Sequence, residues 1–333
     1  MSSSSSRFGA IFLLLIVSAL FMTFWDEART RMIVNSSLHT TAQQHSQSIG
    51  KRYAYATLLH GPAEVEDDDG SFEKDSYFMA TRVLAYQLLH SNISTTADIP
   101  FLVLVTEAVT QEKQARLRED GATVIVVDKI DAPAWMHAAS GRWLEMLTKL
   151  HIFELTDYDK VCYMDSDILV VENLDGVFED EATNPRMTTR EHVVSDEPAM
   201  PPQYVLAAHS DNYAYDHPYP PDQERDYLNA GFLVIQPSKE LFDYYVVISK
   251  IKDRFLADAM EQNLLNYVHR WSGDMPWQRL WYGWNTNFAT FKDYEGGTKS
   301  FHDKYWGGNA ASDAVLCKMW QEQRRKMEEH WRR

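Results

Sequence analysis

The chain has very little cysteine: Cys162 and Cys317 are the only two in 333 residues. Two thiols cannot build a disulfide framework, so a packed core must hold the fold together. The length and a 45% share of hydrophobic residues are sufficient for such a core. Cys162 lies inside an apolar run, where an inert core thiol is expected.

Positive charge is also scarce. Lysine and arginine number 32 against 48 aspartates and glutamates, which gives a formal net charge of −16. Nucleic-acid binding requires a basic surface, so we expect no nucleic-acid partner. This balance does not exclude a small phosphorylated substrate that is held through a metal ion.

One long stretch carries no charge at all, from Phe8 to Trp25. Its length fits the lower end of a membrane-spanning helix, about 17–25 residues. Arg7 favours a cytoplasmic N-terminus. We therefore expect a cytoplasmic tail over residues 1–7 and a transmembrane signal anchor over residues 8–25. A cleavable signal peptide is the alternative, although its apolar core is usually shorter, about 7–15 residues.

With either leader, the folded domain would face the lumen of the secretory pathway. The sequons at Asn35 and Asn92 are compatible with that location. We predict a single-pass type II protein of the Golgi or ER membrane, with its folded domain lumenal. Residues 26–50 are polar and lack periodicity, which is typical of a flexible stem.

Residues 51–312 alternate apolar runs with helical patterns, which predicts a Rossmann-like α/β fold with a mostly parallel central sheet flanked by helices. The predicted buried strands are RYAYATLLH, IPFLVLVT, ATVIVVD, KVCYM and YLNAGFLVIQPS. The predicted helices are DSYFMATRVLAYQLLH, TQEKQARLRED, WLEMLTKLHIFEL, KELFDYYVVISKI and DAMEQNLLNYVHRW, followed by a charged C-terminal helix over residues 313–333. Residues 181–226, rich in Pro, Tyr, His and Asp, predict a long functional or mobile loop, which we interpret as a lid.

Asp165 and Asp167 directly follow the apolar strand KVCYM. Two carboxylates this close repel each other and resist desolvation, and a divalent cation would relieve both effects. A solvated acidic turn is the alternative, and a D-x-D pattern alone favours it. However, ligands of α/β sheets bind beyond the carboxyl ends of the strands, which is where this pair lies. The position therefore favours a functional site.

Six segments in order, ATLL, LTKLHIF, YMDSDILVVENLD, YLNAGFLVIQPS, EQNLLN and FHDKYW, resemble glycosyltransferase family 8. These are glycogenin-like, retaining enzymes of the GT-A fold, and the chain resembles a membrane-anchored, fungal-type member of the family. The resemblance covers about Tyr53–Trp306. It implies one GT-A catalytic domain over residues 51–312. It also implies transfer of a hexose or N-acetylhexosamine from a UDP-sugar to a glycan or other hydroxyl acceptor. Two alternatives remain open: an inactive membrane-anchored sugar-binding subunit and, less favoured, a D-x-D phosphatase.

The resemblance also implies a metal site and its surroundings. Asp165, Asp167 and His302 would ligate Mn²⁺ or another divalent cation. Ser166, between the two aspartates, and Lys304 would contact the UDP-sugar. Only Asp303 separates His302 from Lys304, a shorter spacing than is usual in the family.

Glu261 and Gln262 are the expected catalytic residues, with Gln262 beneath the anomeric carbon. Asp258 and Gln262 are four residues apart, which predicts one shared helix face. The other positions expected to bind the donor are Lys149, Asn229 and Asp258 near the sugar, with Gly231 allowing a close backbone approach, and Thr57, Leu58, Tyr77 and Arg142 near the uridine and diphosphate.

Some residues have two open interpretations. Asp226 is either a sugar-hydroxyl acceptor or an ordinary loop acid, and Tyr77 and Arg142 could equally have core or surface roles. The tryptophans at 271, 277, 281 and 284 could stack on acceptor sugars, although packing is the commoner role of such clusters. Asp67–Asp69 are interpreted as a solvated loop, and His192, His209 and His217 are too irregularly spaced for a zinc site.

Overall fold

The computed structural model describes residues 51–61, 75–96, 98–137, 141–221, 224–307 and 311–332, without the side chains of residues 141–144. The predicted tail, anchor and stem, residues 1–50, lie outside the described residues, as does the Asp67–Asp69 cluster. Among the helices that are described, none has the length and apolar character needed to cross a membrane.

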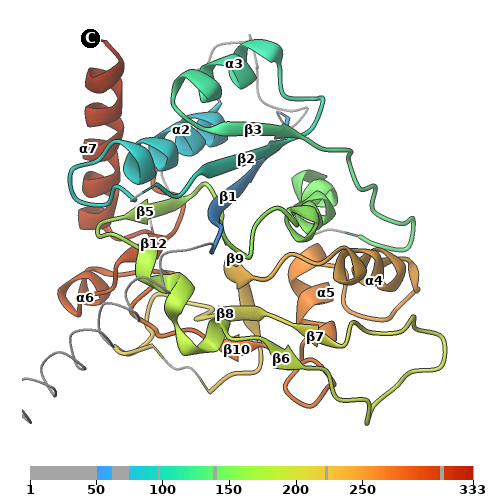
Figure 1. Ribbon diagram of the computed structural model, residues 1–333. Helices are drawn as coiled ribbons and strands as arrows, with labels where there is room; N and C mark the ends of the chain where they lie inside the picture. Colours follow the sequence, from blue (N-terminus) through green and yellow to red (C-terminus); the bar gives the residue numbers. More distant parts are fainter. Residues whose placement is uncertain are drawn as a thin grey trace, which may run out of the picture. The chain divides into compact units, whose positions relative to one another are not determined.

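A seven-stranded mixed sheet, in the order β10-β8-β9-β4-β1-β2-β3, forms the centre of the fold (Figure 1). Four neighbouring strands run parallel, as predicted: β4 (Lys160–Met164), β1 (Tyr53–Leu59), β2 (Phe101–Val105) and β3 (Thr123–Val126). On the other side of β4, β9 (Leu228–Ile235) is antiparallel to both β4 and β8 (Leu206–Ser210), and β10 (Gln278–Arg279) pairs parallel with β8.

The apolar runs become strands because both faces of the sheet are covered. Every residue of β2 is buried, which explains why its sequence is continuously apolar rather than alternating. The prediction of a buried strand at ATVIVVD is wrong in one respect. β3 is the edge strand, and its four residues are only partly buried or exposed, because no strand lies beyond it.

Helices of two groups cover the two faces. The first core contains residues of the strands together with η1 (Gly141–Glu154), α4 (Lys239–Lys250) and α5 (Met260–Val268). The second core, on the opposite face, contains residues of α2 (Ser76–Leu89) and α3 (Gln111–Glu119). We predicted an amphipathic helix at WLEMLTKLHIFEL, and η1 is a 3-10 helix. The predicted helix is thus present with a tighter winding, and its second half is almost wholly buried, with Leu147, Leu150, Ile152 and Phe153 in the first core.

The helix ends follow local side-chain chemistry. Asp75 caps α2 by accepting hydrogen bonds from the backbone N–H groups of Tyr77 and Phe78 at 3.1 and 3.0 Å. Its second oxygen accepts from Lys113 Nζ of α3 at 2.9 Å, which ties the two helices together. After α3 the chain turns at Gly121, whose φ of +96° is accessible mainly to glycine.

A smaller three-stranded sheet lies beside the main one. It contains β5 (Ile168–Val170), β12 (Ser300–His302) and β11 (Thr286–Asn287). The C-terminal helix α7 (Ala314–Trp331) lies alongside α2 (Figure 1), and its buried residues Leu316, Trp320 and Met327 join the core around this sheet. The short helix α6 (Phe291–Glu295) lies between β11 and β12 in the chain.

The expectation of one long lid over residues 181–226 is wrong at its centre. This segment contains η3 (Glu181–Thr183) and a small pair of strands, β6 (Arg186–Met187) and β7 (Gln203–Tyr204), after η2 (Asp175–Glu179). It then enters the main sheet as β8, all five residues of which are buried. The run Tyr204–Ala208 is short and lies among prolines, so its strand signal was weak.

Candidate active site

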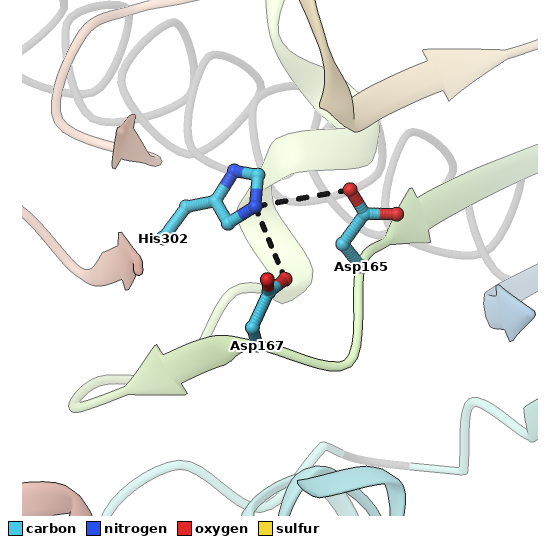
Figure 2. Close-up of side chains that lie close together, drawn as sticks. All are labelled: Asp165, Asp167 and His302. Atoms are coloured by element: carbon cyan, nitrogen blue, oxygen red, sulfur yellow. Dashed lines mark ion pairs between the residues drawn. The ribbon is translucent and has the colours of Figure 1, made fainter. Parts of the chain in front are cut away.

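Three chain segments bring Asp165, Asp167 and His302 together (Figure 2). Asp165 directly follows β4, and Asp167 directly precedes β5. His302 is the last residue of β12, which pairs antiparallel with β5 so that His302 is opposite Ile168. This register places the imidazole beside Asp167, although 135 positions separate them in sequence (302 − 167).

The side chains of the three residues point toward one another, and their possible ligand atoms lie close enough together to bind one ion. His302 Nε2 lies 3.1 Å from Asp167 Oδ1 and 3.7 Å from Asp165 Oδ2. One ligand atom from each residue falls within 4.8 Å of the others. Within the described part of the chain, this is the one group of three His, Cys, Asp or Glu side chains spaced to hold a metal ion.

The donor set fits a divalent cation. Asp167 Oδ1 is buried and has no hydrogen-bond partner among the described residues, although His302 Nε2 lies 3.1 Å away as an ion-pair partner. A buried carboxylate oxygen without a hydrogen-bond donor is costly unless a cation completes it. Two carboxylates and one imidazole form a mixed ligand set that Mn²⁺ accepts.

Gly231 closes the back of this cluster. A Cβ atom at this position would lie 2.1 Å from His302 Cε1 and 2.9 Å from Asp165 Oδ2. No side chain larger than hydrogen fits there. The backbone at Gly231 therefore lies close to His302 and Asp165, and the predicted close approach to a substrate there stays a prediction.

A buried lysine supports the second oxygen of Asp165. Lys149 Nζ lies 3.2 Å from Asp165 Oδ1 and 2.8 Å from Glu261 Oε1, and it donates to Ala230 O at 3.3 Å. Tyr163 OH also donates to Asp165 Oδ1, at 2.6 Å. Lys149 thus orients two carboxylates from behind. Its side chain is 2% exposed, and the expected contact of Lys149 with the donor sugar stays a prediction.

The charges perturb one another strongly. Burial alone would lower the pKa of Lys149, but Asp165 and Glu261 outweigh it and raise the pKa above its usual value. Burial likewise opposes a charged His302, yet Asp167 and then Asp165 raise its pKa to about 9. The pKa of Glu261 is raised, because burial prevails over the attraction of Lys149.

A cavity of about 410 Å³ opens in front of the cluster. Most of its lining residues carry charged or amide side chains, although Met146, Met260 and Phe288 also line it. The lining residues come mainly from the ends of β4, β8, β9 and β12 and from the start of α5. The charged and amide side chains that line it are Asp165, Asp167, Asp211, Asn229, Glu261, Gln262, Asn287, His302, Asp303 and Lys304. Seven of these ten were expected from the sequence.

Asp211, Asn287 and Asp303 were not expected. Asp211 Oδ2 accepts from Asn229 Nδ2 at 2.9 Å, and Asp211 Oδ1 accepts from Asn287 Nδ2 at 3.1 Å. Asp211 follows β8, which runs parallel to β4, so both strands deliver an aspartate to the same edge of the sheet. The same strand-end rule would have found Asp211, had β8 been recognised.

Other expected residues lie away from the cavity wall. Thr57 and Leu58 are buried in β1, and Thr57 Oγ1 makes no hydrogen bond. Tyr77 packs edge-to-face on Trp306, with ring centroids 5.0 Å apart. Ser166 is buried between the two aspartates. The side chain of Arg142 lies outside the described residues.

Asp258 and Gln262 lie in different surroundings at the start of α5. The helix begins at Met260, so Asp258 precedes it and does not share a helix face with Gln262. Asp258 is exposed and accepts from Asn263 Nδ2 at 2.7 Å. Gln262 Oε1 accepts from the backbone N–H of Ala230 at 2.9 Å, which fixes the amide at the cavity wall.

Asp226 and the tryptophans mostly contact one another or other protein groups. Asp226 accepts from Trp271 N at 2.8 Å and from Trp277 Nε1 at 3.1 Å, which supports its interpretation as a loop acid. Trp277 is buried, whereas Trp281 is exposed. Among the described residues, His192, His209 and His217 belong to no group of three side chains spaced to hold a metal ion.

Two residues that line the cavity and one residue near it have left-handed backbone angles. Met260 and Phe288 line the cavity with φ of +42° and +52°, and Tyr213, two residues after Asp211, has φ of +62°. None is a glycine, so each conformation is strained and must be imposed by its surroundings. Such strain is characteristic of functional sites.

The fold and site define an α/β protein with a candidate metal site and a polar cavity at the strand ends. The sequence model described as "Glycosyl transferase family 8" matches residues 72–305, so the chain belongs to this family. An uncharacterised Schizosaccharomyces pombe protein is 32% identical over 303 residues, 81% of this chain and 77% of its own length. Human glycogenin-2 is 25% identical over 279 residues, 83% of this chain but only 45% of its own. The structure of the Streptococcus pneumoniae glycosyltransferase GlyE has a TM-score of 0.50 at 16% identity, covering 85% of this chain and 63% of that one, which supports the fold alone.

Proposed function

We propose that the protein is a metal-dependent, retaining glycosyltransferase that moves a hexose or N-acetylhexosamine from a UDP-sugar to a glycan or another hydroxyl acceptor. The observation that carries the proposal is the convergence of Asp165, Asp167 and His302 on a polar cavity, with a buried ligand oxygen that makes no hydrogen bond. Membership of a glycosyltransferase family gives this convergence its chemical meaning.

The two walls of the cavity suit two tasks. Asp165, Asp167 and His302 would hold Mn²⁺ or a similar cation on one wall, and Lys304 adds a cation nearby. The metal would supply Lewis-acid stabilisation of the departing diphosphate. On another wall, Glu261 and Gln262 present a carboxylate and an amide to the sugar, where they can stabilise developing positive charge.

The test is donor binding followed by turnover. Isothermal titration with Mn²⁺ should detect one of UDP-glucose, UDP-galactose, UDP-N-acetylglucosamine and UDP-xylose, and chelation should remove the signal. NMR of the product should show the same anomeric configuration as the donor. Tight binding without turnover would favour the inactive sugar-binding subunit, whereas release of inorganic phosphate from phosphate esters would favour the phosphatase.

We also propose that residues 8–25 anchor the protein in the Golgi or ER membrane with its catalytic domain lumenal. The charge-free run beside Arg7 supports this topology. The full-length protein should sediment with membranes after an alkaline carbonate wash, and the domain should be protected from added protease in intact vesicles. A mature protein that starts beyond residue 20 and stays soluble would contradict the anchor.

A further inference from the structure

Two tyrosines form a stacked pair beside the cavity. Tyr213 lies three residues beyond the end of β8, and Tyr227 immediately precedes β9. Because β8 and β9 pair antiparallel, these two segments lie side by side. The ring centroids are 5.6 Å apart, and the ring planes are 23° from parallel.

Both tyrosines are hydrogen-bonded to residues of the cavity or next to it. The backbone N–H of Tyr213 donates to Asp211 Oδ1 at 2.8 Å. Tyr227 OH accepts from Gln262 Nε2 at 3.3 Å and donates to Asn263 Oδ1 at 2.6 Å. Asp211 and Gln262 line the cavity, so each tyrosine is one hydrogen bond away from the cavity wall, although neither is itself a lining residue. We call this position the rim.

Tyr213 is the exposed member of the pair. Its side chain is 54% exposed, whereas Tyr227 is half-buried, and the guanidinium of Arg225 lies 5.2 Å from the Tyr213 ring centre. Tyr213 also has the left-handed φ of +62°, an unfavourable angle for a bulky residue. A strained backbone that presents a large aromatic ring to solvent, next to a polar cavity, contributes little to stability and suggests a binding role.

We propose that Tyr213, backed by Tyr227, is the stacking surface for the acceptor sugar. The inference rests on the proposed function, since it concerns the second substrate of the same cavity. A pyranose ring has a face of C–H groups and a periphery of hydroxyls. An aromatic ring complements the face, and carboxylate and amide groups complement the hydroxyls. Asp211, Asn229 and Asn287 supply those polar groups beside Tyr213.

Trp281 is the rival platform and a matched control. Its side chain is 45% exposed, close to the value for Tyr213. However, its ring packs against Trp284, 5.4 Å away, and its backbone N–H donates to Asp180 at 3.1 Å. Neither partner lines the cavity. Loss of Trp281 therefore removes a similar exposed aromatic ring without touching the rim.

The experiment measures transfer by the full-length protein with Mn²⁺, the UDP-sugar that binds best, and the methyl α- and β-glycosides of glucose, galactose and mannose as acceptors. Hydrolysis of the donor by water reports the donor side separately. Tyr213→Ala should raise the acceptor KM about tenfold, with donor hydrolysis unchanged. Tyr213→Phe, which keeps the ring, should stay within about twofold of the parent, and so should Trp281→Ala.

Each other outcome has a distinct meaning. An unchanged acceptor KM in Tyr213→Ala overturns the inference while leaving the proposed function intact. Slower donor hydrolysis in that variant also overturns it, because Tyr213 would then act on the donor side. A raised acceptor KM in Trp281→Ala alone moves the platform to the tryptophan. A parent protein that neither hydrolyses any of the four UDP-sugars named above nor transfers a sugar from them refutes the proposed function, and the inference with it.

Discussion

Two histidines with little or no exposed surface, His302 and His269, experience opposite electrostatic environments. His302 lies between two carboxylates that raise its pKa to about 9, and its Nδ1 makes no hydrogen bond. His269 lies in the core, where burial lowers its pKa to about 4. Both of its nitrogens are paired, Nε2 with Tyr245 OH at 2.5 Å and Nδ1 with Met275 O at 2.6 Å.

The difference shows that His302 belongs to a candidate binding site, whereas His269 belongs to the structural core. Both ring nitrogens of His269 are paired within the protein, so the ring contributes to stability and needs no ligand. Around His302 two carboxylates lie close together, and Asp167 Oδ1 and His302 Nδ1 have no hydrogen-bond partner among the described residues. A bound cation would complete these groups. Variants should therefore affect binding at His302 and folding at His269.

The largest effect is expected from Asp167→Asn. The change removes one ligand charge and relieves repulsion between the two aspartates, so the fold should persist while transfer falls at least about a thousandfold. Melting temperature with and without Mn²⁺ and UDP measures the metal response, which should vanish. Asp243→Asn, the same chemical change on the exposed face of α4, serves as the control. A metal-dependent rise equal to that of the parent would show that these carboxylates are not the metal site.

Gly231→Ala should come next. The added methyl group would overlap the His302 ring and displace it from Asp165, so affinity for Mn²⁺ should fall about a hundredfold. Gly307→Ala is the matched control, because nothing lies within 4 Å of a Cβ atom there. Titration of Mn²⁺ into both variants decides the matter. Equal affinities would mean that Gly231 does not position His302.

His269→Phe should act on stability and not on binding. The substitution leaves the buried Tyr245 hydroxyl and the Met275 carbonyl without partners, at a cost of about 2–4 kcal/mol in the free energy of unfolding. Urea unfolding measures this loss. The Mn²⁺-dependent rise in melting temperature should remain the size of the parent's, and its disappearance would refute the separation between the two regions.

The smallest effect is a difference in pH dependence. The pKa of His269 is about 4 in the folded protein, below its usual value of 6.5, so the unfolded chain binds the proton more readily. The stability it contributes is therefore complete above about pH 6.5 and is lost as the pH falls toward 4. Between pH 7 and 5 the parent should lose more stability than His269→Phe does, by about 2 kcal/mol. Parallel pH profiles of the two proteins would contradict the assignment.

The same contrast explains what the sequence could predict. Asp165 and Asp167 follow an apolar strand, and the strand-end rule placed them correctly at a cavity. His302 carried no local signal, because its position depends on the pairing of β12 with β5; only the family resemblance pointed to it. Asp211 was missed along with β8, and the partners of His269 come from another helix and a loop. Contacts between distant segments are what local patterns do not encode.

The strained residues offer a guide to engineering. Asp98 and Asp253 also have left-handed angles, φ of +57° and +58°, but neither lines the cavity. Glycine at these two positions would relieve backbone strain where substrates are not handled. Met260 and Phe288 also have left-handed angles, but they line the cavity. Glycine at either position would make the cavity wall more flexible. A stabilised version of this protein should therefore keep the residues with strained backbone angles that line the cavity. Its stabilising substitutions should be made at positions away from the cavity.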